Sequence, residues 1–242
     1  MRRFFIDKNS IRQKSVVIKG KEAHHIKDVI RLKKGERFLG LDDTGNKYIL
    51  RIKGITDSVT AEIEKVSSRK IEMPKLLLAC ALPKKSKIDY IIEKATELGV
   101  SEVVPMVTER TIVKIDKKNK NSKQKRWERI ALEASKQCGR ETLPKVYEVM
   151  NFKDAIKLAS DLEYNTRILP CLSEGTKELK EVITNKTEKI AVFIGPEGDF
   201  TDKEIEYAES KGLDTVSLGP LVLRVDTACL FSISAIQTIL SI

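Results

Sequence analysis

Short apolar runs alternate with turns over the first 70 residues of the chain. Strand-like segments cover residues 3–6, 15–19, 37–41, 47–55 and 59–66. One helical pattern, formed by Ala23, Ile26, Val29 and Ile30, interrupts them, and Asp42-Asp43-Thr44-Gly45 is typical of a hairpin turn. This pattern predicts a small, mostly β barrel.

After about residue 75 the pattern changes to strands that alternate with helices. Strands are expected at 76–82, 103–107, 167–172, 189–194 and 215–218, and helices at 88–98, 124–138, 152–161, 176–184, 201–210 and 226–242. The polar segment 67–74, which ends in proline, separates the two patterns. We therefore predict a barrel domain of residues 1–72 and an α/β domain of residues 73–242 with a largely parallel sheet.

The chain is basic, and its charge is unevenly distributed. The formal net charge is +10, and residues 1–72 hold 18 Lys and Arg against 10 Asp and Glu. This balance favours a polyanionic partner that docks on the first domain. A second basic stretch, residues 114–126, has seven basic residues and one acid. It is typical of a mobile loop, and contact with nucleic acid is the alternative.

Cysteine usage and hydropathy indicate the compartment. The four cysteines are widely spaced: Cys80, Cys138, Cys171 and Cys229. His24 and His25 are the only other soft ligands, so we expect buried free thiols rather than disulfides or a zinc site. No apolar run reaches membrane-spanning length and the N-terminus has no signal-peptide core, which predicts a cytoplasmic protein.

Two glycine-bearing turns near the C-terminus carry the candidate chemistry. Residues 194–200 (IGPEGDF) and 218–227 (LGPLVLRVDT) each follow a short apolar run and precede a helical pattern. Both turns therefore belong at the carboxyl edge of the sheet, where α/β folds bind ligands. Neither a dinucleotide nor a P-loop motif is present, and Glu197 would repel a pyrophosphate. We expect a ligand with a neutral or cationic core, such as a nucleoside or a sulfonium.

The final segment, residues 226–242, is apolar on almost every side. A helix of this kind has to be covered on several faces. A homodimer and a fully buried central helix both satisfy that requirement.

These motifs resemble the signature of the SPOUT (α/β-knot) RNA methyltransferases. The resemblance rests on Gly195-Pro-Glu-Gly198, Leu218-Gly-Pro220 and Leu223-Arg-Val-Asp-Thr227, with supporting stretches at 24–26, 29–31, 93–100, 108–110 and 137–140. It implies a PUA-like or OB-like barrel followed by a trefoil-knotted α/β domain that binds S-adenosylmethionine and forms a homodimer. It also implies methylation of N3 of a uridine in the 16S rRNA of the small ribosomal subunit, without a metal.

The resemblance assigns roles to individual residues. Backbone groups that would hold the cofactor belong to Leu172, Ile194, Gly195, Pro196, Glu197, Gly198, Leu218, Gly219, Pro220 and Leu223. Arg224 would stabilise the uridine anion, and Asp226 or Glu197 would accept the N3 proton. Candidate RNA contacts are Arg2, Arg3, His24, Arg31, Lys33, Lys34, Arg110 and Arg140.

The chain departs from the usual family pattern at three positions. Asp199 stands where glycine is usual, Leu221 where arginine is frequent, and Asp226 where glutamate is usual. Two other functions stay open. A ribose 2′-O-methyltransferase of the same superfamily normally carries an Asn-rich motif, which residues 79–86 lack. A non-catalytic RNA-binding or ribosome-assembly factor would tolerate a degraded cofactor turn, whereas residues 195–198 are intact.

Overall fold

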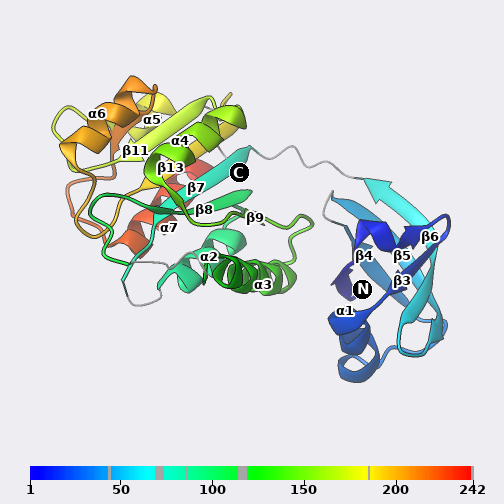
Figure 1. Cartoon of the computed structure of the whole chain (residues 1–242). Coiled ribbons are helices and arrows are strands. Elements are labelled where there is room, and N and C mark those ends of the chain that lie inside the picture. The colour runs from blue at the N-terminus through cyan, green and yellow to red at the C-terminus, as the bar shows by residue number, and fades with distance from the viewer. Residues whose placement is uncertain (43–44, 69–73, 85–86, 114–118, 185, 241–242) are drawn as a thin grey trace. The chain divides into compact units, whose positions relative to one another are not determined.

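The chain divides into two units, both drawn in Figure 1. The computed structural model describes residues 1–42, 45–68, 74–84, 87–113, 119–184 and 186–240. One unit comprises Met1–Glu72 with Ser135–Leu143, and the other comprises Met73–Ala134 with Pro144–Ile242. Most of the expected interdomain segment 67–74 lies outside the described residues, although Ser67 and Ser68 continue a strand.

A six-stranded sheet forms most of the first unit. Its strands are β1 (Arg3–Phe5), β2 (Ile11–Arg12), β3 (Ser15–Ile18), β4 (Arg37–Leu41), β5 (Asn46–Ile55) and β6 (Val59–Ser68). Their order is β1-β4-β5-β6-β3-β2, with β1 parallel to β4 and the other pairs antiparallel. A 3-10 turn (Lys8–Ser10), helix α1 (Gly20–His24) and a π-helical turn (His25–Val29) lie between strands. The expected mostly β fold of this region is confirmed.

The core of this unit follows from alternation along its strands. Leu50 and Ile52 of β5 are fully buried, as are Val16, Ile26 and Phe38 on neighbouring elements. Successive side chains of a strand point to opposite faces of the sheet, so an alternating sequence buries one face only. Tyr48 of β5 is buried as well, and the other positions along β5 stay partly or fully exposed.

A buried acid shapes the hairpin between β4 and β5. Asp42 Oδ1 accepts a hydrogen bond from the Asn46 amide (2.9 Å), and Asp42 Oδ2 accepts one from the Tyr48 hydroxyl (2.8 Å). These donors compensate the cost of burying a carboxylate. Asp43 and Thr44 of the predicted turn lie outside the described residues.

An eight-stranded sheet, parallel in every pair, forms the second unit. Its strands are β7 (Lys75–Ala81), β8 (Glu102–Val107), β9 (Lys145–Val146), β10 (Met150–Asn151), β11 (Thr166–Pro170), β12 (Lys177–Glu178), β13 (Lys189–Ile194) and β14 (Asp214–Ser217). The order is β10-β8-β7-β13-β11-β14-β12, with β9 also paired to β8. Strand β7 is buried along its length except for Lys75, which is why it reads as a continuous apolar run.

Helices cover both faces of this sheet (Figure 1). They are α2 (Lys87–Glu97), α3 (Lys120–Cys138), α4 (Phe152–Asp161), α5 (Leu179–Val182), α6 (Asp202–Ser210) and α7 (Val225–Ile239). One core packs residues of α2, α3, α5 and α7 against the sheet, and a second core packs α4 and α6 against the opposite face. The α/β architecture is therefore as predicted, and the knot stays a prediction. In the described part of the chain, no helix has the length and apolarity needed to cross a membrane.

Helix α3 begins earlier than the sequence pattern indicated. The sequence predicts a helix over 124–138 and a basic loop over 114–126, whereas the helix starts at Lys120. Residues 114–118 lie outside the described part. Lys, Gln and Arg are good helix formers, and the Gln124 side chain donates a hydrogen bond to the carbonyl oxygen of Val146 (3.0 Å). The loop interpretation is therefore wrong for residues 120–126.

The helix expected over residues 176–184 is also shorter than predicted. Lys177–Glu178 form strand β12, and only Leu179–Val182 are helical. The short helix begins with a capping box between Glu178 and Glu181, a signal that sequence reasoning did not use here.

Candidate active site

A cavity of about 210 Å³ lies at the carboxyl ends of three neighbouring strands. Pro170 ends β11, Ile194 ends β13 and Ser217 ends β14, and all three residues line the cavity. The loops after these strands and the first turn of α7 complete the lining. Both glycine turns therefore meet at one site, in the position where parallel α/β sheets bind ligands.

The lining contains most of the expected cofactor residues: Leu172, Ile194, Gly195, Pro196, Glu197, Leu218, Gly219 and Leu223. Gly198 and Pro220 lie in the same turns but outside the lining. Sequence reasoning did not single out Cys171, Ser173 and Thr176, which follow β11. The apolar run that predicted β11 could have indicated them, because its carboxyl end had to lie beside that of β13.

Gly195 shapes the turn after β13. A Cβ atom at this position would lie 3.1 Å from two ring carbons of the buried Phe200 and 3.2 Å from Oδ1 of Asp199. Contacts of this length are tighter than most Cβ contacts in proteins, so Phe200 or Asp199 would have to shift by a few tenths of an ångström. Arg110 fixes the turn from outside, because its Nη1 donates hydrogen bonds to the carbonyl oxygens of Gly198 (2.7 Å) and Phe200 (3.1 Å).

Asp199 adopts a left-handed backbone conformation, with a φ of 57°. Glycine favours this region, and aspartate is among the few other residues that tolerate it. The Asp199 carboxylate accepts hydrogen bonds from the amides of Leu172 (3.0 Å) and Phe200 (2.8 Å). An aspartate can therefore replace the usual glycine here and add side-chain contacts.

The charged groups among the described lining residues are Glu197 and Asp199, both acidic. Glu197 is exposed, and its Oε1 accepts a hydrogen bond from the Lys84 backbone amide (2.9 Å). The other lining side chains are apolar or neutral. This lining favours a ligand with a cationic centre and disfavours a phosphate.

Asp226, in the first turn of α7, is held by Lys87 of helix α2. The Lys87 Nζ lies 2.9 Å from both carboxylate oxygens, although the two residues are 139 positions apart in sequence. Burial raises the pKa of Asp226, but hydrogen bonds from Lys87 and the Asp226 amide, with the charges of Lys87 and Arg224, outweigh it and leave the pKa below its usual value. The pair therefore stabilises the fold at neutral pH, and this contribution is lost as the pH falls through the lowered pKa.

Arg224 is the exposed N-terminal cap residue of α7. Its neighbours Leu223 and Val225 line the cavity, whereas Arg224 and Asp226 do not. The structure thus places the predicted catalytic arginine beside the cavity lining. Of the two candidate proton acceptors, only Glu197 belongs to the lining.

The candidate RNA contacts differ in how they are engaged. The exposed members in the first unit are Arg2, Arg3, His24, Arg31, Lys33 and Lys34. Arg3 donates a hydrogen bond to the carbonyl oxygen of Gly139 (2.8 Å), and His24 Nδ1 lies 2.6 Å from an oxygen of Asp28. Burial lowers the pKa of Arg140.

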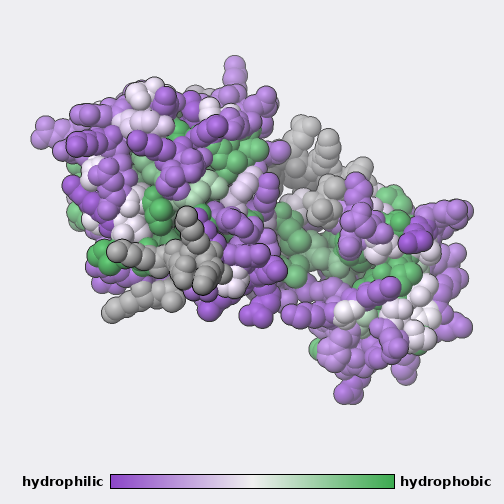
Figure 2. Space-filling view, viewed as in Figure 1, coloured by the Kyte–Doolittle hydropathy of each residue, from purple (hydrophilic) through white to green (hydrophobic). Residues whose placement is uncertain are grey.

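Figure 2 shows that hydrophilic residues dominate the surface in that view.

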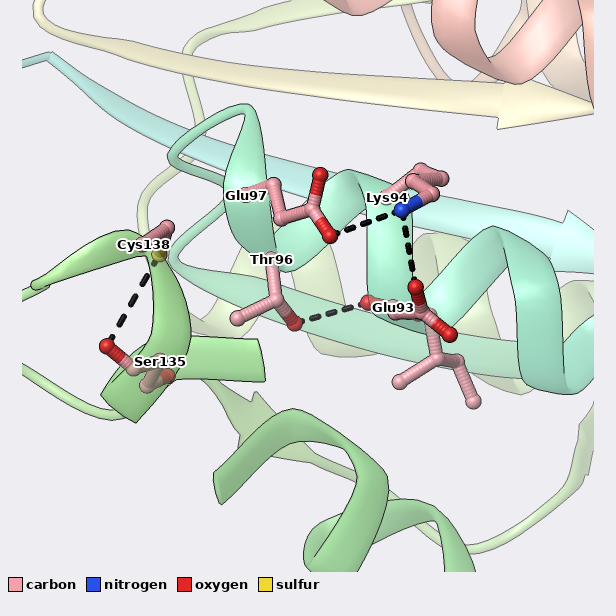
Figure 3. Close-up of polar contacts among 7 residues, drawn as sticks. Glu93, Lys94, Thr96, Glu97, Ser135 and Cys138 are labelled. Carbon is pink, nitrogen blue, oxygen red and sulfur yellow. Dashed lines mark hydrogen bonds and ion pairs between the residues drawn. The ribbon is translucent and has the colours of Figure 1, made fainter. Parts of the chain in front are cut away.

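The Glu93–Val100 motif serves helix α2 rather than the cavity. Lys94 forms ion pairs with Glu93 and Glu97, each at 2.8 Å, and Thr96 donates a hydrogen bond to the carbonyl oxygen of Ile92 (2.7 Å; Figure 3). The hydrogen bonds from Lys94 to the two glutamates raise its pKa above the usual value. These contacts are local to one helix, so Lys94 and Thr96 have a structural role in α2.

All four cysteines are free, as predicted. Cys80 and Cys229 are buried, with their sulfur atoms 3.5 Å apart. Cys171 is partly buried in the cavity wall, and burial raises the pKa of its thiol. Cys138 is exposed, so the expectation of burial is wrong for this residue. Cys138 lies at the end of α3, a mainly polar helix.

Comparison with known families agrees with this geometry. A model described as an RNA methyltransferase domain matches residues 71–237, and one described as an RNA methyltransferase PUA domain matches residues 18–64. The chain belongs to this RNA methyltransferase family. The resemblance drawn from the glycine turns is thereby confirmed at the family level.

Individual relatives are similar over almost the whole chain. Ribosomal RNA small subunit methyltransferase E of Bacillus subtilis is 30% identical, over 98% of this chain and 96% of the relative. The protein of the same name from Synechocystis is 32% identical, over 98% and 78%. A crystal structure of ribosomal RNA small subunit methyltransferase E from Neisseria gonorrhoeae bound to S-adenosyl methionine superimposes with a TM-score of 0.83 at 27% identity, covering 98% of this chain and 97% of that one.

Proposed function

We propose that this chain is an S-adenosylmethionine-dependent methyltransferase that modifies N3 of a uridine in 16S rRNA of the small ribosomal subunit. The observation that carries the proposal is the cavity that both glycine turns build together, in a chain that aligns over 98% of its length with relatives named ribosomal RNA small subunit methyltransferase E. The similarity to a relative bound to S-adenosyl methionine supports the cofactor. We assign the activity to the cytoplasm, where such a substrate is found.

The residues present fit this cofactor. The lining is mostly apolar, has two carboxylates, and uses Gly195 where a Cβ atom would press on Phe200 and Asp199. Apolar walls suit an adenosine, and acidic groups suit positive charge. When bound, the cofactor would supply a methyl group from its sulfonium, and the sulfur would leave as a neutral thioether. Leu172, residues 194–197 and the 218–223 turn would hold it.

The protein then has to align the base and manage its N3 proton. Alignment for in-line attack converts a bimolecular step into an effectively unimolecular one. Arg224 is exposed and lies between two cavity-lining residues, so its guanidinium is available to the oxygens of an incoming uracil. A planar guanidinium stabilises the uridine anion through those oxygens.

We assign the proton acceptor to Glu197 rather than Asp226. Glu197 lines the cavity, whereas Asp226 is bound at both oxygens by Lys87 and has a lowered pKa. A lower pKa makes a weaker base. In this account the Lys87–Asp226 pair fixes the start of α7, and with it the position of Arg224.

Glu197→Gln is expected to lower the single-turnover methylation rate about 100-fold at neutral pH, because the amide cannot accept the N3 proton. The glutamine keeps an oxygen that accepts from the Lys84 amide, so the turn retains its shape. Asp226→Asn is the matched control and is expected to lose less than about tenfold, without a change in the pH profile. Rapid-quench assays over a pH series measure both. A larger loss in Asp226→Asn than in Glu197→Gln would reverse the assignment.

The first unit is proposed to dock the RNA. It holds most of the excess positive charge and matches the RNA methyltransferase PUA domain. Lys33 and Lys34 are exposed, whereas Arg3 and His24 already contact protein groups. Among the candidate contacts, we therefore expect these two lysines to reach phosphates.

Replacing Lys33 and Lys34 by alanine is expected to weaken binding of 16S rRNA and to flatten its salt dependence. Each phosphate contact contributes about 0.7 to 0.9 to the slope of log affinity against log salt, so the double variant should lose roughly 1.4 to 1.8. Filter binding at several salt concentrations measures the slope. Lys203→Ala, an exposed lysine of α6 in the second unit, should leave the slope unchanged. An unaltered slope in the double variant would remove these lysines from the interface.

A homodimer is proposed on the apolar residues that stay exposed. Leu221 and Val222 are 74% and 76% exposed, and Phe231 on α7 and Tyr90 on α2 are about half exposed. Exposed apolar side chains of this size on neighbouring elements are typical of an interface. Sedimentation analysis tests the dimer.

The test of the proposed function is transfer of a labelled methyl group from S-adenosylmethionine to purified small subunits. We expect label in 16S rRNA, released on nuclease digestion as a base-modified uridine. Label in a ribose would favour the 2′-O-methyltransferase alternative. Absence of transfer with intact RNA binding would favour the non-catalytic factor.

A further inference from the structure

The wall of the cavity contains a carboxylate that joins two loops. Asp199 lies in the turn after β13. Its carboxylate accepts a hydrogen bond from the amide of Leu172, which lies in the loop after β11. The two residues are 27 positions apart in sequence. Both line the cavity, so the hydrogen bond spans its wall.

The backbone on each side of this contact is fixed independently. The Cys171 amide donates a hydrogen bond to the carbonyl oxygen of Val216 in β14 (3.2 Å), which holds the start of the loop after β11. The Asp199 amide donates one to the carbonyl oxygen of Pro196 (3.0 Å), which closes the glycine turn. Beyond Cys171, the Leu172 amide is held by Asp199, and the Leu172 side chain is 63% exposed.

The position of the carboxylate depends on the glycine before it. Asp199 Oδ1 also accepts from the Phe200 amide (2.8 Å) and lies where a Cβ atom of Gly195 would approach to 3.2 Å. The side chain is thus folded back over Gly195, with both oxygens engaged. Its left-handed φ of 57° would suit glycine at least as well, so backbone shape alone gives no reason for an aspartate.

We propose that Asp199 is a positioning residue for the cofactor: its carboxylate ties the Leu172 loop to the glycine turn and thereby sets the separation of two walls of the cavity. The inference rests on the proposed function, because it assigns the cavity to S-adenosylmethionine. A loop held in its bound position loses less freedom when the ligand binds, which is how preorganisation increases affinity.

Three variants separate the tether from the backbone conformation. Asp199→Gly removes the carboxylate but suits the left-handed φ, Asp199→Ala removes the carboxylate and keeps the strain, and Asp199→Asn keeps one acceptor oxygen. We expect the dissociation constant for S-adenosylmethionine, measured by calorimetry, to rise about tenfold in both the glycine and alanine variants. The asparagine variant should lie between them and the parent. Asp202→Asn, which removes a charge at the start of α6, should bind as the parent does.

Three further readouts distinguish positioning from a merely structural role. The unfolding temperature of the protein without cofactor should be lower for Asp199→Ala than for Asp199→Gly, although both bind the cofactor equally weakly. In steady-state assays of Asp199→Gly, the KM for the cofactor should rise about tenfold while kcat at saturation stays within about twofold. Amide hydrogen exchange at Leu172 should be faster in both variants.

The outcomes separate this inference from the proposed function. Parental affinity in Asp199→Gly, while the parent binds S-adenosylmethionine, would overturn the tether and leave the proposed function standing. A parent protein that fails to bind S-adenosylmethionine would overturn the proposed function and this inference together.

Discussion

Arg224→Ala is expected to lower the single-turnover rate of methyl transfer about 1000-fold, with the affinity for S-adenosylmethionine changed less than about threefold. Arg224 is exposed and lies between Leu223 and Val225 of the cavity lining, without belonging to that lining itself. Its loss should therefore remove stabilisation of the developing uridine anion and leave the cofactor contacts in place. Rapid-quench kinetics at saturating RNA and cofactor measure the rate.

Arg224→Lys is the control that tests the planar geometry. A lysine keeps the charge but not the paired donors of a guanidinium, so we expect it to recover less than about tenfold of the lost rate. Parental activity in Arg224→Ala would contradict the assignment. If the cofactor affinity falls in proportion to the rate, Arg224 contributes to cofactor binding and not to the chemical step.

Gly195→Val is expected to abolish detectable binding of S-adenosylmethionine. A Cβ atom at Gly195 would already lie 3.1 Å from Phe200, and the two methyl groups of valine would extend further into the turn. Calorimetry measures the binding, and thermal unfolding shows whether the variant stays folded. Gly195→Ala should show the same effect in weaker form.

Gly198 provides the matched control for this prediction. A Cβ atom there would lie 3.5 Å from Arg110, an ordinary van der Waals contact, and Gly198 does not line the cavity. Gly198→Ala should therefore bind the cofactor within about threefold of the parent. If the Gly195 and Gly198 variants lose cofactor affinity equally, the conformation of the whole turn limits binding, and not the close contacts at Gly195 alone. If Gly195→Val is folded and binds S-adenosylmethionine with parental affinity, the cavity is not the cofactor site.

Elements with strong periodicity could be predicted from the sequence. Helix α4 and strand β13 have the predicted bounds, because an apolar period and a polar boundary coincide at their ends. Helix α3 was placed too late, since its first turns are polar and have no apolar stripe. Strands of two residues, such as β2 and β12, carry no period that could be recognised. The grouping of Ser135–Leu143 with the first unit depends on tertiary contacts.

The location of the candidate site could be predicted from the sequence, but its side-chain contacts could not. Two glycine turns after apolar strands were sufficient to locate the cavity, because parallel strands bring their carboxyl ends together. The partner of Asp226 was not predictable, since Lys87 lies 139 positions away and local patterns hold no information on that pairing. The left-handed φ of Asp199 could not be predicted either. A glycine marks such a position in a sequence because it adopts this conformation readily, and here the residue is an aspartate.

Mass mapping of modified uridines in 16S rRNA, from cells with and without this gene, tests the proposed function in the cell. We expect one uridine to carry a methyl group at N3 in the parent strain and to lack it in the deletion strain. The parental chain should restore the modification, and Arg224→Ala should not. Identical maps from the two strains, or a modification that disappears from a ribose or from another RNA, would show that this chain does not methylate N3 of a uridine in 16S rRNA.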